Sequence, residues 1–151
     1  MTLSSSLEDY LEAMIDLFNY EGKIRVSDIS VKLKVEKSSV NTAVKKLKNL
    51  NLITHEKYGD VILTEKGKLK AEEIKEKHII ISKFLTDFLG LSDKDADKDA
   101  CKIEHTLSSH TFKRLLFFIQ FMEESPFFDK NKWKESFNRY LESVESSEQE
   151  V

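Results

Sequence analysis

The stretch that decides the fold spans residues 26–49 and reads VSDISVKLKVEKSSVNTAVKKLKN. Apolar residues recur in it at helical spacing, which predicts one helix over residues 26–33 and a second that ends near Asn49. Ser27 is the expected N-cap of the first helix, and Ser38 or Ser39 that of the second. In the second helix, the residues expected to face the core are Val40, Val44 and Leu47.

A longer helix precedes this pair and a β-hairpin follows it. The helix is capped by Ser5 or Ser6 and ends near Tyr20, and Ser5 and Glu8 have the spacing of a capping box. Its expected inward residues are Leu7, Leu11, Met14, Ile15 and Phe18. Two short strands, residues 52–57 and 61–63, surround a turn at residues 58–60. Three helices and a hairpin in this order predict a winged helix-turn-helix, whose third helix enters the major groove of DNA.

Positive charge gathers in the same region. Residues 23–48 contain eight basic and two acidic residues, whereas residues 71–151 contain 12 basic and 17 acidic residues. The residues placed to meet DNA on the third helix are Ser38, Ser39, Asn41, Thr42, Lys45 and Lys46, and those at the wing tip are Lys57 and Tyr58. Hydroxyls and amides bond base edges or phosphates, and lysines neutralise phosphates. A solvated helix face explains any one lysine, but the whole set favours binding to double-stranded DNA.

Composition limits the alternatives. The chain has 151 residues, 40% hydrophobic and 34% charged, which is enough for one or two small domains with a packed core. One Pro and four Gly favour helices over a turn-rich β fold. The single Cys excludes an intramolecular disulfide framework. No apolar run approaches the roughly 20 residues of a membrane span, and the N-terminus lacks a secretory signal. A cytoplasmic protein without a membrane partner is therefore expected.

The second half of the chain is expected to be wholly helical. Helical patterns cover residues 65–89, residues 92–107, a segment from Ser108 through Met122, and a last amphipathic helix after Pro126. The acidic, serine-rich tail from Glu142 is expected to fray. No Gly/Ser linker marks the join between the halves, so we place one domain at residues 1–70 and the other at 71–151, joined by a continuous helix. The core and the two-fold interface of this second domain are predicted to include Phe84, Phe88, Leu115 and Phe118.

Potential metal ligands occur on three of the predicted helices. Cys101, Glu104 and His105 share one helix face at spacing i, i+3, i+4, and Asp9 and Glu12 are also three apart. His78 stands on a third helix. Thiolate, imidazole and carboxylate together suit a divalent transition metal. Taken singly, the two acids suit a helix N-terminus, the histidine a half-buried site and the cysteine a small buried side chain.

Several motifs together resemble the diphtheria-toxin-repressor family of metal-dependent repressors. They are Asp9-Tyr10-Leu11-Glu12, the helix-turn-helix through Ser38-Ser39-Val40, Leu63-Thr64-x-Lys66-Gly67, His78, and Cys101-x-x-Glu104-His105-x-Leu107-Ser108. The resemblance covers residues 3–124, and the chain length is similar to that of the shorter, manganese-responding branch. It implies a mainly α protein, with a winged helix-turn-helix followed by an all-helical dimerisation domain. It also implies a homodimer on an operator, with a metal ion between the two domains.

Residue by residue, the resemblance describes a hybrid of two branches. Asp9 and Glu12 match the first-helix ligands of the manganese branch, and His78, Glu104 and His105 match its other ligands. Cys101 stands where the manganese branch has Glu and the iron branch has Cys. The implied co-repressor is Fe²⁺ or Mn²⁺, and the implied output is repression of metal-uptake genes. Ser82 and Asp97 replace two ligands of the iron branch's ancillary site, which predicts that this second site is weakened.

Two other classes of function remain open at this point. One is a winged-helix regulator that senses a small organic ligand or the oxidation of Cys101. The other is an enzyme that uses Cys101 and His105 as nucleophile and base, although the sequence offers no glycine-rich loop to stabilise an oxyanion. Binding to DNA that depends on a metal ion discriminates the repressor from both. We expect no catalytic residue and no small organic substrate.

Overall fold

The computed structural model describes residues 3–21, 23–56 and 59–148, and the chain forms two compact units that divide after residue 76. The division falls six residues beyond the boundary that the sequence suggests. One helix, α4 (Glu65–Asp87), runs through it without a break. The join is therefore a continuous helix, as the absence of a Gly/Ser linker predicts.

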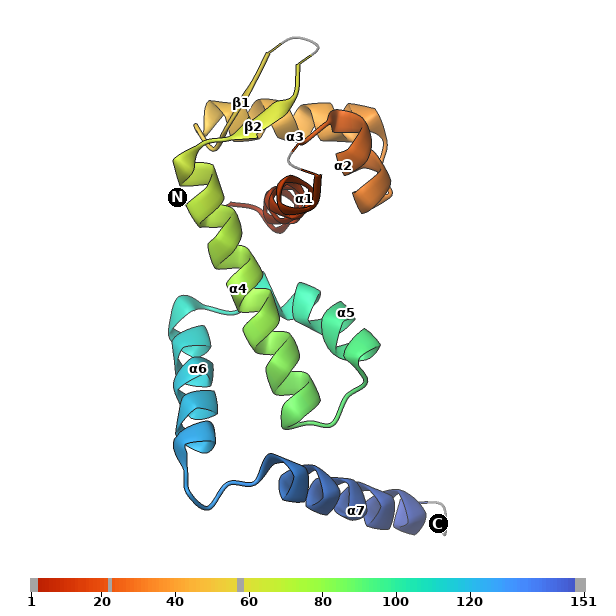
Figure 1. Ribbon diagram of the computed structural model, residues 1–151. Helices are drawn as coiled ribbons and strands as arrows, with labels where there is room; N and C mark the ends of the chain where they lie inside the picture. Colours follow the sequence, from red (N-terminus) through yellow and green to blue (C-terminus); the bar gives the residue numbers. More distant parts are fainter. Residues whose placement is uncertain (1–2, 22, 57–58, 149–151) are drawn as a thin grey trace. The chain divides into compact units, whose positions relative to one another are not determined.

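Unit 1 contains three helices and a hairpin before α4 begins (Figure 1). The helices are α1 (Ser5–Glu21), α2 (Val26–Leu33) and α3 (Lys37–Asn49). The strands β1 (Ile53–His55) and β2 (Val61–Leu63) pair antiparallel, with Ile53 opposite Leu63. This order confirms the predicted winged helix-turn-helix.

The predicted N-caps of these three helices are wrong by one to three residues. α2 follows Arg25 and α3 follows Glu36, both with extended backbone and without a side-chain cap. The Ser27 hydroxyl instead donates to the carboxylate of Asp28, 3.0 Å away. α1 begins at Ser5, and the carbonyl of Ser4 accepts from the amides of Leu7 and Glu8, so its first turn starts one residue before the predicted cap. Serine-rich sequence alone misplaces these helix starts by a few residues.

The helix-turn-helix depends on a tight connection between α2 and α3. Lys34 adopts a left-handed conformation with φ of 55°, and its amide closes the end of α2. The Ser30 hydroxyl donates to the carbonyl of Val35, 2.6 Å away, which fixes the return of the chain. Val40, Val44 and Leu47 are buried, as predicted. The opposite face of α3 is therefore directed outward.

The hydrophobic core of unit 1 joins α1 to α2, α3, both strands and the start of α4. Its most deeply buried side chains include Leu11, Met14, Ile29, Leu47 and Ile53. Phe18 was expected among them and is 40% exposed, because it lies near the end of α1. The ammonium of Lys68 covers its ring from 5.5 Å, which is a cation–π arrangement.

Gly67 allows α4 to pack closely against the hairpin. A Cβ at this position would lie 1.8 Å from the carbonyl oxygen of Leu52, so no other residue fits without moving the backbone. The Thr64 hydroxyl donates to the carbonyls of Asn51 and Leu52 and accepts a hydrogen bond from the Gly67 amide. Thr64 and Gly67 thus fix the angle at which α4 leaves the wing.

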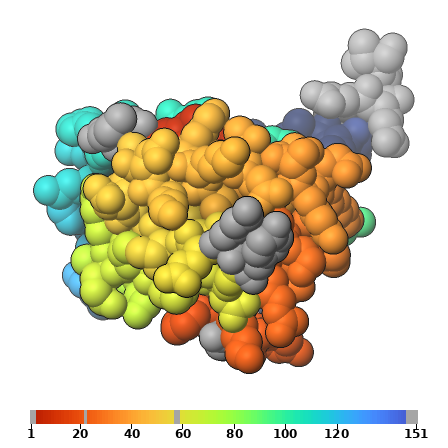
Figure 2. Space-filling view, turned by 90° about the horizontal axis from the view of Figure 1, so that it is seen from above, coloured from red at the N-terminus to blue at the C-terminus, as the bar shows by residue number. Residues whose placement is uncertain are grey.

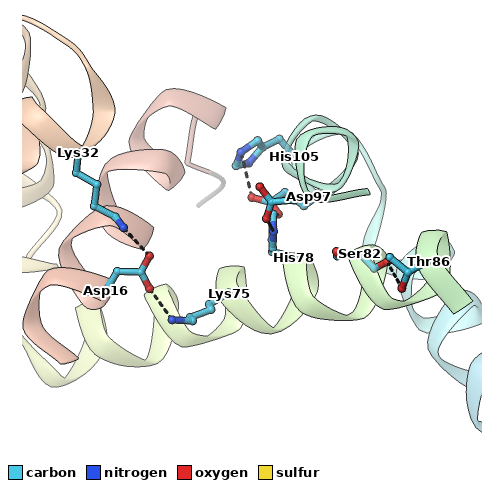
Figure 3. A network of polar contacts seen from close by, with 9 residues as sticks. Asp16, Lys32, Lys75, His78, Ser82, Thr86, Asp97 and His105 are labelled. Atoms are coloured by element: carbon cyan, nitrogen blue, oxygen red, sulfur yellow. Dashed lines mark hydrogen bonds and ion pairs between the residues drawn. The ribbon is translucent and has the colours of Figure 1, made fainter. Parts of the chain in front are cut away.

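Asp16 connects three helices of unit 1. Its two carboxylate oxygens accept from Lys75 of α4, at 2.5 Å, and from Lys32 of α2, at 3.0 Å (Figure 3). Burial raises the pKa of this carboxyl group, but the hydrogen bonds and charges of Lys75 and Lys32 outweigh burial. The pKa of Asp16 is therefore held below its ordinary value of 3.8.

Unit 2 contains the second part of α4 and three more helices. These are α5 (Asp93–Glu104), α6 (Ser109–Glu124) and α7 (Lys130–Glu148). Here the serine caps are real, because Ser92 and Ser108 accept from the amides of Asp95 and Thr111. Its buried hydrophobic residues are mainly small or aliphatic, and they are Ile81, Leu85, Phe88, Ala96, Ala100 and Ile119.

Two expectations for the second half need correction. α7 continues through Glu148, so the tail does not fray from Glu142. α4 and α5 end at Asp87 and Glu104, two and three residues before the predicted ends. None of the helices in the part of the chain that the structure describes is both long enough and apolar enough to cross a membrane.

We predict that Asp16→Asn destabilises the protein by about 1 kcal/mol at pH 7, because it removes the charge that Lys32 and Lys75 contact. The folded pKa is lowered, so the stabilisation is present above the unfolded pKa and is lost as pH falls through the folded pKa. Urea unfolding at several pH values measures this. The difference from the wild type should shrink below about pH 4. Glu72→Gln, an exposed position on α4, is the control.

Candidate DNA-binding surface and metal-binding residues

The predicted recognition residues share the outward face of α3. All six are exposed, and they are Ser38, Ser39, Asn41, Thr42, Lys45 and Lys46. In Figure 2, α3 lies beside the hairpin on one face of unit 1. The Thr42 hydroxyl donates to the carbonyl of Ser38, 3.0 Å away, and its oxygen keeps a free lone pair for an outside donor. Lys57 and Tyr58 of the predicted wing tip lie outside the described residues.

The base of the wing is held against α3. The Lys48 ammonium donates to the carbonyl of His55, at 2.9 Å, and the His55 ring lies 3.1 Å from the carbonyl of Gly59. Lys48 therefore has a structural role that its neighbours Lys45 and Lys46 lack. α3 and the hairpin form one continuous surface as a result, which is the arrangement that a winged helix presents to DNA.

Four of the predicted metal ligands come together within unit 2. His78 lies on α4, Cys101 and Glu104 lie on α5, and His105 caps the end of α5. The carboxylate oxygens of Glu104 lie 2.8 Å from Nδ1 of His78 and 3.3 Å from Nε2 of His105. The Cys101 sulfur and a ring nitrogen of His105 are within 4.8 Å of each other. Glu104 itself is 3% exposed, so this carboxylate sits in the interior between two imidazoles.

Asp97 is a further member of this cluster, which the sequence analysis named only as a replacement in the ancillary site and not among the ligands. Its Oδ1 lies 3.0 Å from Nε2 of His78, as Figure 3 shows. A carboxylate at the far ring nitrogen fixes the orientation and tautomer of a ligating histidine. The signal was present in the sequence, because Asp97 precedes Cys101 by one helical turn on α5.

Asp9 and Glu12 lie on α1, in unit 1. Both are half-buried, and their spacing of three places them on one helix face. Glu8 is the acid in the first turn of α1, and these two lie beyond it. The helix dipole acts mainly within the first turn, so it does not account for them. Cys101 is exposed, which also excludes the interpretation of a small buried thiol.

The donor set fits a divalent transition metal ion. His78 and His105 offer imidazole nitrogen, Glu104 offers carboxylate oxygen, and Cys101 offers a thiol at the same end of α5. Mixed nitrogen, oxygen and sulfur ligands select ions such as Mn²⁺, Fe²⁺, Co²⁺ and Zn²⁺ over Mg²⁺ or Ca²⁺. A buried carboxylate beside two imidazoles is also a group that a cation would stabilise.

Comparison with known proteins decides between the open alternatives. The family profile "Iron dependent repressor, N-terminal DNA binding domain" matches residues 2–61, and "Iron dependent repressor, metal binding and dimerisation domain" matches residues 64–131. An uncharacterised HTH-type transcriptional regulator of Methanocaldococcus jannaschii is 41% identical over 120 residues, which are 78% of this chain and 95% of that protein. The chain belongs to the diphtheria-toxin-repressor family. It is a DNA-binding transcriptional repressor with a divalent metal ion as co-repressor, and not an enzyme.

Other members of the diphtheria-toxin-repressor family are also similar. The HTH-type transcriptional regulator MntR of Listeria monocytogenes is 36% identical over 121 residues, covering 80% of this chain and 84% of that one. The manganese regulator SloR has a TM-score of 0.68 at 31% identity, and T. acidophilum IdeR has a TM-score of 0.66 at 27% identity. These alignments cover 80% and 75% of this chain. The chain spans just over half of those two solved chains, 55% and 53%.

We predict that Lys45→Ala and Lys46→Ala each weaken binding about equally for all DNA sequences. Each lost phosphate contact should reduce the slope of log affinity against log salt by about 1. Fluorescence anisotropy over a salt series measures the slope. Lys94→Ala, at an exposed position of α5, should leave it unchanged. An unchanged slope in both α3 variants would show that this helix does not lie on DNA.

Proposed function

We propose that this chain is a homodimeric repressor of metal-ion uptake genes, acting in the cytoplasm, with Fe²⁺ as the physiological co-repressor and Mn²⁺ as the alternative. The proposed ligands are Asp9, Glu12, His78, Cys101, Glu104 and His105. The observation that carries this proposal is the buried Glu104 carboxylate between two imidazoles, beside a thiol. Both ions are considered because the matched domain family is named for iron, whereas the similar regulator SloR is named for manganese.

Each ligand residue has a role that follows from its position. Glu104 presents both carboxylate oxygens, one toward each histidine. Asp97 orients the ring of His78 by holding its Nε2. Asp9 and Glu12 bring two more carboxylates from α1, the helix on which unit 1 is built. A bound divalent cation supplies the positive charge that offsets the repulsion among these carboxylates.

Ligands drawn from both units give the switch its basis. Without a cation, Asp9 and Glu12 are repelled by Glu104 whenever the three approach, because like charges at short range disfavour one another. With a cation, the same carboxylates are drawn to a common centre. The cation shifts the populations of the two arrangements only through the difference between its affinities for them. A difference of a few kcal/mol in binding free energy is sufficient for a strong switch. In a two-fold dimer, this sets the separation of two copies of α3, which must match one turn of DNA, roughly 34 Å.

Unit 2 offers a surface for the dimer. Three phenylalanines of α6, namely Phe117, Phe118 and Phe121, are 43–69% exposed, whereas Ile119 of the same helix is buried and Phe112 and Leu115 pack against the core of unit 2. Contiguous exposed aromatic side chains mark interaction surfaces. Of the four residues predicted in the core and the two-fold interface, Phe88 is a buried core residue, and Phe118 is the one that stays exposed.

The proposal is tested by DNA binding under controlled metal. Operator fragments are first selected from a random pool with metal-loaded protein, and their affinity is then measured after chelation and after addition of Mn²⁺, Fe²⁺, Co²⁺ or Zn²⁺. The proposal predicts that chelation abolishes specific binding and that Fe²⁺ or Mn²⁺ restores it. Specific binding that survives chelation, or that follows oxidation of Cys101 instead, contradicts it.

We predict that Cys101 is a direct ligand and favours Fe²⁺ and Co²⁺ over Mn²⁺, because a thiolate adds little to the affinity for Mn²⁺. Cys101→Ser should weaken Fe²⁺ and Co²⁺ binding more than Mn²⁺ binding, and Cys101→Glu should shift the preference toward Mn²⁺. Titrations with each ion measure this. Co²⁺-loaded wild type should also show an intense thiolate-to-metal absorption in the near ultraviolet. A wild type without that band would place Cys101 outside the ligand set.

We predict that Phe121→Glu converts the dimer to monomer at micromolar concentration, because it places a charge on the apolar face of α6. Gln120→Glu, at the exposed position directly before Phe121, is the matched control and should leave the dimer intact. Sedimentation velocity with and without metal measures both variants. A monomeric wild type under both conditions would contradict the proposed homodimer.

A further inference from the structure

α7 is firmly attached to the rest of unit 2 at its N-terminal end. The indole nitrogen of Trp133 donates to the carbonyl of Phe88, 3.0 Å away, at the C-terminal end of α4. The rings of Phe88 and Phe128 stack at 5.4 Å between centroids, and Phe137 stacks on Trp133 at 6.4 Å. Aromatic contacts of this kind add to the energy of burial, so the first half of α7 has a defined direction.

A charged contact reinforces the same attachment. Asp87 is 6% exposed, and its two oxygens accept from Lys130 at 2.6 Å and from Lys134 at 3.5 Å. The two lysine side chains are 49% and 37% exposed, so the buried partner of these ion pairs is Asp87, and loss of the lysines would leave its charge buried without them. Gly90 has a φ of 70°, and a Cβ there would lie 3.2 Å from the side-chain oxygen of Asn138. α7 thus passes close over the turn between α4 and α5.

α7 carries a row of apolar side chains along one face, which we call the seam. Its members are spaced four, three and four residues apart, and they are Trp133, Phe137, Tyr140 and Val144. This spacing is typical of a helix that packs against another helix. The seam begins at the attachment and continues past it, where Tyr140 is 62% and Val144 36% exposed. No residue of α7 with a described side chain is buried.

We propose that the seam of α7 from Tyr140 to Val144 packs against a second copy of this chain and forms part of the dimer interface. This inference rests on the homodimer proposed above and assigns it a second contact surface. The match to the dimerisation domain ends at residue 131, and α7 begins at Lys130. α7 thus follows that domain along the chain, and the seam lies beyond the end of the match.

The exposed apolar area of the three phenylalanines on α6 is too small for a stable dimer interface, which favours a second contact surface. A stable interface buries roughly 800 Å² on each partner. A phenylalanine side chain offers about 200 Å² at most, and the three on α6 are only partly exposed. Full coverage of these rings supplies less than half of the required area. The rigid attachment of α7 removes most of the entropic cost of ordering this helix on a partner.

The test compares dimer dissociation constants of the full chain by sedimentation over a dilution series. The double variant Tyr140→Glu/Val144→Glu places two charges on the seam and should weaken the dimer at least tenfold. Arg139→Gln/Ser146→Glu changes the net charge by the same amount on the opposite side of α7, and should change the constant less than twofold. Tyr140→Ser/Val144→Ser is a milder version that should give an intermediate weakening.

The outcomes separate this inference from the proposed dimer. A dimer that is lost in Phe121→Glu but unchanged in both seam variants overturns the role of α7 and leaves the dimer in place. Equal weakening by the seam variants and by Arg139→Gln/Ser146→Glu also overturns it, because charge and not the seam would then be the cause. Circular dichroism confirms that each variant keeps its helices.

Discussion

The arrangement of unit 2 depends on a buried carboxylate. Glu104 is almost completely enclosed, and its two oxygens face His78 of α4 and His105 at the end of α5. A carboxylate in such a place is stabilised only by hydrogen-bond donors or positive charge close to it. The two helices must therefore keep His78 and Glu104 in register, and the small residues Ala96 and Ala100 allow α5 to approach closely enough. Cys101 and Asp97 share this helix, so one contact organises the whole ligand cluster.

Unit 1 is stabilised by an apolar core and by the ion pairs of Asp16, which together fix the position of α3. Its apolar core fixes α3 with one face inward and the polar face outward. Asp16 ties α1 to α2 and to α4 through two lysines. α1 also carries Asp9 and Glu12, and α4 carries His78 three residues after Lys75. α1, which offers two of the proposed ligands, is thus the helix against which α2 and α3 pack.

Much of the fold could be predicted from the sequence, and both the correct predictions and the wrong ones have physical reasons. The helix-turn-helix followed from the apolar spacing of Val40, Val44 and Leu47, which the core enforces. The N-caps of α2 and α3 did not, because Arg25 and Glu36 hold those positions without a side-chain hydrogen bond although serines lie nearby. Phe18 was misplaced because its position near the end of α1 leaves one side open. The contact of Asp97 with His78 was not predicted, because the two residues are nineteen apart in sequence and only folding brings their side chains together.

Reciprocal coupling between metal and DNA is the central claim, and calorimetric titration tests it most directly. Mn²⁺ or Fe²⁺ is titrated into the full chain, once alone and once in the presence of saturating operator fragment. If both ligands favour the same arrangement, each must tighten the other by the same factor. The account predicts that operator increases metal affinity by the factor by which metal increases operator affinity, and that Glu12→Gln reduces both factors together. A metal affinity that is unchanged by operator would contradict it.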